Sequence, residues 1–195
     1  MSNSRERILN TLRNNLPTQR ELPSLDEFTN QPSEGDVVAR FIEVLRTIGG
    51  AVIEAPDLPT IAHYIAEHYT GKRVVSVVPG LESVTTQGLA TDPHLLADVE
   101  LAVLNTHFAV AENGACWITD VLVGDRALPF ITQHLALIVQ RSTIVPTMHA
   151  AYQKIGQSAQ DFGTFIAGPS KTADIEQSLV LGAHGPKSMT VFVIG

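Results

Sequence analysis

The sequence predicts an α/β fold in which helices flank a mixed, mostly parallel sheet, with an N-terminal helical arm in front. From residue 35 onward, apolar residues at helical spacing alternate with short apolar runs typical of strands covered on both faces. Closely spaced strand candidates between residues 99 and 119 indicate a local hairpin, which adds antiparallel pairing. The length of 195 residues and the hydrophobic content of 44% allow one well-buried core.

The N-terminal segment 1–34 is expected to form a helix and a linker ahead of one domain over residues 35–195. Ile8, Leu12 and Leu16 recur at helical spacing, and a polar, proline-bearing stretch follows them. Such an arm docks either on its own domain or on a neighbouring subunit, and the sequence leaves both alternatives open.

The elements of the main domain follow from periodicity and from glycine and proline signals. A helix is expected from Val38 to Ile48, where two glycines end it, and a strand follows at 51–53. A second helix is expected from Pro59 to a stop at Gly71, followed by a strand at 73–78. Further strands are expected at 99–104, 115–118, 135–139, 164–167 and 189–194, and further helices at 146–159 and 172–181.

Composition excludes several classes of function. The formal net charge of -7 argues against nucleic-acid binding, which relies on clustered Lys and Arg. No segment approaches the roughly 18 consecutive apolar residues of a membrane span, and the polar start lacks a signal-peptide core. We therefore expect a cytoplasmic protein with no membrane span.

Cys116 is the single cysteine of the chain. One thiol cannot form an internal disulfide, a Cys-rich zinc site or a four-Cys iron-sulfur cluster, so any such cluster has to belong to a partner. Cys116 lies in an apolar run with strand character, which favours packing over catalysis. The seven histidines show no local ligand spacing, so no metal site is expected.

The segment 164–176 reads as a strand, a tight turn and a helix. Gly168 allows close approach of the backbone, Ser170 or Thr172 can cap the helix, and free amides of its first turn favour an anion beside Lys171. These four residues are candidate ligand-binding residues. The alternative is that Ser170 and Thr172 only cap the helix.

A second glycine-rich turn surrounds His184, with Gly182 before it and Gly185 after it. Gly185 is a candidate binding residue, and His184 is a candidate general base if Asp174 or Glu176 can orient it. The alternative is a histidine at the surface or in a cap.

Glu112 lies in the turn 109–114 and is a candidate nucleophile or base. Asn113-Gly114 is a strong turn signal, and the alternative is a hairpin tip with Glu112 in solvent.

The run G-P-S-K-T-A-D-I-E-Q-S-L-V-L-G-A-H-G-P, from Gly168 to Pro186, resembles the C-terminal signature of the lactate-utilization (LUD) domain family, and the whole chain resembles its lactate utilization protein C branch. The resemblance implies a fold like the sugar-phosphate isomerases and coenzyme A transferases of the NagB/RpiA type. It also implies work beside Cys-rich iron-sulfur proteins that oxidise L-lactate to pyruvate, with no cofactor in this chain. On this basis we expect the 168–186 stretch to build the ligand-facing surface.

Two functions from different classes remain open. In the first, the chain is a subunit or accessory protein of an iron-sulfur-dependent lactate oxidation system and binds a small anionic ligand or a partner. In the second, it is a stand-alone enzyme on a sugar phosphate, a coenzyme A thioester or a folate, with Glu112 as base or nucleophile. A purely structural module is a third possibility. The sequence also leaves a homo-oligomer open.

Overall fold

The computed structural model describes residues 3–18, 20–21, 23–24, 35–86, 92–156, 161–173 and 179–195. The chain divides into two compact units, Met1–Gln31 and Pro32–Gly195. No helix within the described ranges is both long enough and apolar enough to cross a bilayer.

The first unit contains helix α1 (Ser4–Asn14), in agreement with the expected helix. The helix begins after Asn3, whose side chain accepts a hydrogen bond from the Arg5 amide. Ile8, Leu12 and Leu16 are all exposed, and α1 buries none of its residues. The described residues of this unit therefore leave the apolar stripe uncovered.

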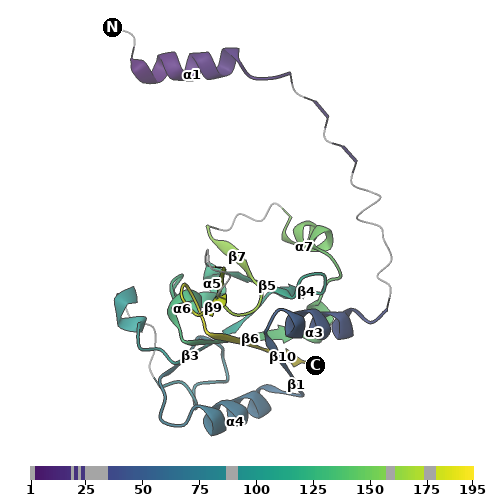
Figure 1. Ribbon diagram of the computed structural model, residues 1–195, viewed down its shortest axis with the longest axis vertical. Helices are drawn as coiled ribbons and strands as arrows, with labels where there is room; N and C mark the ends of the chain where they lie inside the picture. The colour runs from purple at the N-terminus through teal and green to yellow at the C-terminus, as the bar shows by residue number, and fades with distance from the viewer. Residues whose placement is uncertain are drawn as a thin grey trace. The chain divides into compact units, whose positions relative to one another are not determined.

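The second unit is built on a five-stranded parallel sheet with the order β1-β10-β6-β3-β2. Figure 1 labels β1, β10, β6 and β3 of this sheet. Its strands are β1 (Ala51–Ala55), β2 (Val74–Ser76), β3 (Leu101–Asn105), β6 (His134–Gln140) and β10 (Ser188–Ile194). All four pairings are parallel. The predicted parallel sheet between helices is confirmed.

Antiparallel pairing occurs in a separate three-stranded sheet of order β4-β5-β7. Its strands are β4 (Phe108–Val110), β5 (Ala115–Thr119) and β7 (Gly163–Ile166). The predicted hairpin between 99 and 119 is confirmed as β4–β5, but it does not extend the main sheet. Phe108, Trp117 and Phe165 pack together on this second sheet.

Helices cover both faces of the parallel sheet, with α3 and α4 on opposite sides (Figure 1). Helix α3 (Val37–Thr47) buries Phe41 and Leu45 in one core cluster, and α4 (Leu58–His68) buries Ile61 and Ile65 in another. Alternate residues of β6 and β10 enter the two clusters, as expected for strands buried on both faces. The described part of this unit also contains η1 (Pro93–Leu96), α5 (Asp120–Val123), α6 (Leu128–Ile131), η2 (Arg141–Thr143) and α7 (Met148–Ile155).

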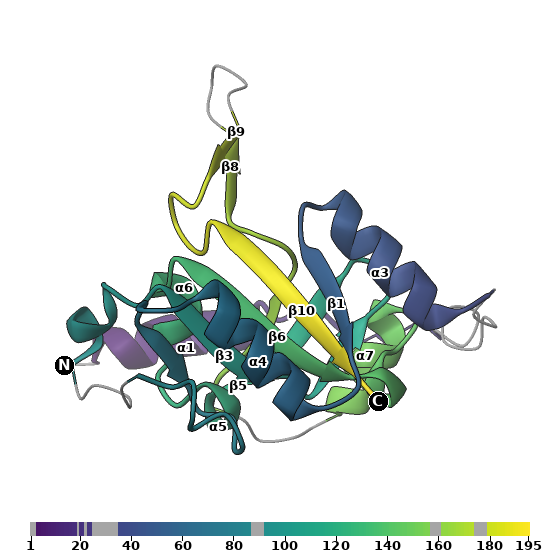
Figure 2. The same ribbon diagram turned by 90° about the horizontal axis from the view of Figure 1, so that it is seen from below.

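The helix expected at 172–181 is wrong. Strands β8 (Lys171–Ala173) and β9 (Leu179–Leu181) pair with each other in an antiparallel hairpin that projects from the body (Figure 2). The Ser170 amide donates to the Pro186 carbonyl, and the Gly182 amide donates to the Ser170 carbonyl. These backbone bonds hold both ends of the segment extended, so tertiary pairing overrides helix propensity.

Candidate functional site

The loop that leaves β7 lies against the turn between α3 and β1. Gly168 has φ +71°, and a Cβ atom there would lie 3.0 Å from the Ile48 carbonyl oxygen. The Lys171 ammonium donates to the same oxygen, and Ile48 is the C-cap of α3. Lys171 therefore satisfies a free carbonyl at the negative end of that helix, where a cation is favourable.

The turn between β4 and β5 also lies against the end of α3. Gly114 also has φ +71°, and its Cβ position lies 3.1 Å from Ile48 Cδ1 and 3.2 Å from Leu45 Cα. Two turns that are about 50 residues apart thus meet on the Ile48 side chain. The structure brings the Gly168 and Gly114 turns together at the end of α3.

Glu112 caps a helix. Its Oε2 accepts a hydrogen bond of 2.7 Å from the Met148 amide, in the first turn of α7. Thr147 is the N-cap of that helix, and its side chain accepts from the Ala150 amide. An exposed carboxylate at this position interacts favourably with the helix dipole, so Glu112 has a structural role whatever else it does.

The remaining predicted residues lie in or beside the hairpin. Ser170 and Thr172 cap no helix, because Thr172 belongs to β8 and Ser170 precedes it; the predicted helix N-terminus for an anion is therefore wrong. A Cβ atom on Gly185 would lie 3.1 Å from Ser170 Cβ, so the Gly185 backbone lies close to the Ser170 side chain. His184 is exposed and makes no hydrogen bond to another described residue. Asp174 and Glu176 lie outside the described residues.

The Gly168 loop and the His184 turn lie at the amino ends of the parallel strands, although ligands of open parallel sheets bind at the carboxyl ends. Gly49 precedes β1, Pro186 precedes β10, and the Lys187 amide donates to the Gln133 carbonyl just before β6. The reason is that β7 belongs to the antiparallel sheet, so its carboxyl end does not share an edge with the carboxyl ends of the main strands.

A polar cluster that the sequence does not reveal lies at this amino edge. His134 Nδ1 is 2.6 Å from Ser188 Oγ, and His134 Nε2 is 3.9 Å from Glu100 Oε1. Lys72 Nζ is 3.6 Å from the same carboxylate oxygen, and burial raises the pKa of the neighbouring Tyr69. The sequence does not reveal the cluster because the β6–β10 register brings together His134 and Ser188, which are 54 positions apart.

A second polar pair lies at the opposite edge, just beyond β3. His107 Nε2 is 2.7 Å from Thr119 Oγ1, and Thr119 is fully buried at the end of β5. Burial lowers the pKa of His107, which favours a neutral ring at neutral pH.

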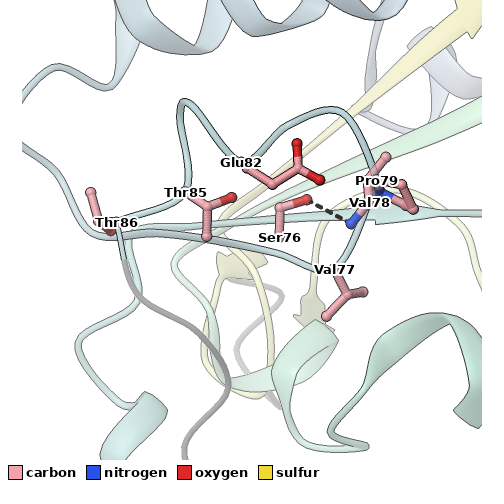
Figure 3. A pocket seen from close by; sticks show the side chains of 7 residues that line it. All are labelled: Ser76, Val77, Val78, Pro79, Glu82, Thr85 and Thr86. Atoms are coloured by element: carbon pink, nitrogen blue, oxygen red, sulfur yellow. Dashed lines mark hydrogen bonds between the residues drawn. The ribbon is translucent and has the colours of Figure 1, made fainter.

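A cavity of about 430 Å³ opens at the carboxyl end of β2 (Figure 3). It is lined by Ser76, Val77, Val78, Pro79, Glu82, Thr85 and Thr86. The sequence carries a usable signal for it, namely a strand followed by Pro79-Gly80 and several polar residues. The position matches the edge at which parallel sheets bind ligands.

Cys116 is fully buried in strand β5, and burial raises the pKa of its thiol far above the ordinary range. The expectation that it packs as a small apolar side chain agrees with this environment. In the described part of the chain, no group of three or more His, Cys, Asp or Glu side chains could hold a metal ion.

Comparison with known proteins adds to this geometry. A family model described as the LUD domain matches residues 94–194. Lactate utilization protein C of Oceanobacillus iheyensis is 22% identical over 98% of each chain. The protein of that name from Geobacillus kaustophilus is 35% identical over 75% of this chain and 63% of its own. The one from Bacillus pumilus is 34% identical over 44% and 38%, so both alignments span less than two thirds of the relative's length.

A solved structure shares the fold. The crystal structure of a DUF162 family protein from Deinococcus radiodurans matches with a TM-score of 0.65, over 85% of this chain and 100% of that chain. At 18% identity this likeness concerns the fold alone.

Proposed function

The chain belongs to the LUD domain family, and on that premise we propose that it is a subunit or accessory protein of an iron-sulfur-dependent system that oxidises L-lactate to pyruvate. The observation that carries the proposal is the likeness to proteins named lactate utilization protein C, which in one case extends over 98% of both chains.

The cysteine content supports a role beside the redox centre. Oxidation of lactate to pyruvate releases two electrons and two protons, and iron-sulfur clusters that accept electrons are held by several cysteine thiolates. This chain has one cysteine, and burial of Cys116 disfavours the thiolate. The clusters therefore belong to Cys-rich partner proteins.

The β8–β9 hairpin is the proposed contact with such a partner. Its two described strands pair with each other alone, and isolated two-stranded hairpins are marginal in water. Val180 and Leu181 are 44% and 50% exposed, and Phe130, whose carbonyl lies beside Gly185, is 42% exposed. An open strand edge next to exposed apolar side chains suits strand addition by another protein.

A partner fits this region better than a small anion does. Lys171 is the residue expected to bind the anion, but its ammonium group already donates to the Ile48 carbonyl. The alternative of a stand-alone enzyme gains no support from Glu112, whose carboxylate caps α7.

A gene deletion tests the proposal. Extracts of the deletion strain should lose L-lactate-dependent dye reduction, and the full chain supplied from a plasmid should restore it. The purified chain alone should reduce no dye with lactate. Lactate oxidation at the parental rate in the deletion strain, assayed with its Cys-rich proteins present, would overturn the proposal.

A further inference from the structure

The cavity at the carboxyl end of β2 takes no part in the function proposed above. We propose that it is a binding site for a small primary amine, and that it rejects carboxylates such as lactate. The proposal rests on the position of the cavity, on the hydrogen-bond character of its side chains and on its single charge.

The cavity lies where the topology favours a ligand. Strand β2 is at one end of the sheet order, where it pairs with β3 on one side and its Val74 carbonyl accepts from the Thr86 amide on the other. The loop after β2 therefore runs between the strand end and Thr86, and the cavity lies along it. That loop turns sharply at Pro79 and Gly80, and Gly80 has φ +95°. The side chains drawn in Figure 3 come from Ser76 at the end of β2, from this loop and from the segment that follows it.

The three hydroxyl groups that line the cavity use their protons inside the protein. Each donates to a backbone carbonyl: Ser76 to Val103 at 3.0 Å, Thr85 to Leu81 at 3.0 Å and Thr86 to Val74 at 2.9 Å. Ser76 also accepts from the Val78 amide (Figure 3), which leaves its oxygen a single free lone pair. The hydroxyls therefore offer a ligand only acceptors.

The fourth polar side chain is a fixed carboxylate. Both oxygens of Glu82 lie 3.0 Å from the Gly80 amide, which holds the carboxylate beside the loop. The hydrogen bonds from the Gly80 amide and from its own amide lower the pKa of Glu82, so the group is ionised at neutral pH. Among the described residues that line the cavity, Glu82 alone is charged.

Acceptors around one negative charge select a cationic donor. An ammonium group can donate three hydrogen bonds and accepts none, whereas a carboxylate accepts only and would be repelled by Glu82. Val77, Val78 and Pro79 supply an apolar wall for an alkyl group. Because the volume is about 430 Å³, a small amine has ample room.

Three compounds with one carbon skeleton test this selectivity. (S)-1-amino-2-propanol carries an ammonium, (S)-1,2-propanediol is neutral and L-lactate carries a carboxylate. Calorimetric titration of the full chain, at matched ionic strength and extended to roughly 50 mM because small ligands bind weakly, should rank the amine above the diol. Lactate should give no heat that depends on this cavity.

Glu82→Gln keeps an acceptor for the Gly80 amide and removes the charge. It should weaken amine binding about tenfold and leave diol binding within about twofold. Glu67→Gln, which removes a charge from an exposed position on α4, is the matched control and should leave both unchanged. Thermal unfolding of both variants checks that the fold is intact.

Three results would overturn the proposal. The first is that lactate binds as tightly as the amine and that neither variant changes its affinity. The second is that Glu82→Gln leaves amine binding unchanged, and the third is that the amine does not bind. None of them bears on lactate oxidation by the partner system, so this site and the proposed function fail separately.

Discussion

Gly168→Ala tests the close approach between the Gly168 loop and the end of α3. A Cβ atom at Gly168 would lie 3.0 Å from the Ile48 carbonyl oxygen and 3.3 Å from Ile48 Cγ1. Gly71 offers a matched control, because its φ is also +71° and no atom lies within 4 Å of its Cβ position. The two alanine variants share the backbone strain and differ in the contact.

The magnitudes follow from these two terms. A left-handed backbone costs an alanine about 1 kcal/mol, so Gly71→Ala should lower the free energy of unfolding by about that amount. At Gly168 the methyl group also meets a backbone oxygen that cannot rotate away, and overpacking of this kind costs about 1–3 kcal/mol more. Gly168→Ala should therefore cost about 2–4 kcal/mol.

Urea denaturation at equilibrium measures both variants, with the slope checked for two-state behaviour. In a domain of this size each kcal/mol lowers Tm by about 2–4 °C, so the pair should also separate in a thermal scan. Equal losses of stability in Gly168→Ala and Gly71→Ala, within about 0.5 kcal/mol, would refute the close approach.

Three further predictions concern other contacts. Glu112→Ala should lower the free energy of unfolding by about 0.5–2 kcal/mol because the Met148 amide loses its cap, and Glu112→Gln should lower it by less. An alanine variant that is as stable as wild type in urea would contradict the cap. Cys116 should react with a thiol reagent at pH 8 only after unfolding, because burial raises its pKa; rapid labelling of the folded chain would count against that burial. Gly163→Ala should cost about 1–3 kcal/mol and alter the fluorescence of Trp117, whose ring lies 2.4 Å from the Cβ position; an unchanged spectrum and stability would exclude that contact.

The parallel sheet and its covering helices could be predicted because their signals are local. Apolar runs such as that of β6 and the periodic stripe of α3 have lengths that fit one kind of element. The β8–β9 hairpin could not, because its extended backbone depends on bonds between Ser170, Gly182 and Pro186, which the sequence does not place together. The polar residues of that segment read locally as the start of a helix.

The candidate site was predicted in part. The sequence predicts close approach of the backbone at Gly168, and the Cβ position of that residue lies against the Ile48 carbonyl oxygen. The partner of Lys171 could not be foreseen, because Ile48 is 123 residues away along the chain. The pairing of His134 with Ser188 depends on strand register, and a scan for local motifs cannot detect it.

Binding to the Cys-rich iron-sulfur proteins of the same organism is the measurement that tests the central claim most directly. The purified chain, immobilised and titrated with those proteins, should bind them, and Leu181→Asp on the hairpin should abolish binding. Leu95→Asp, at a position that is 59% exposed outside the hairpin, should bind as wild type does. Equal binding by both variants would contradict the hairpin as the contact, and no binding by the wild-type chain would contradict its place in an iron-sulfur lactate oxidation system.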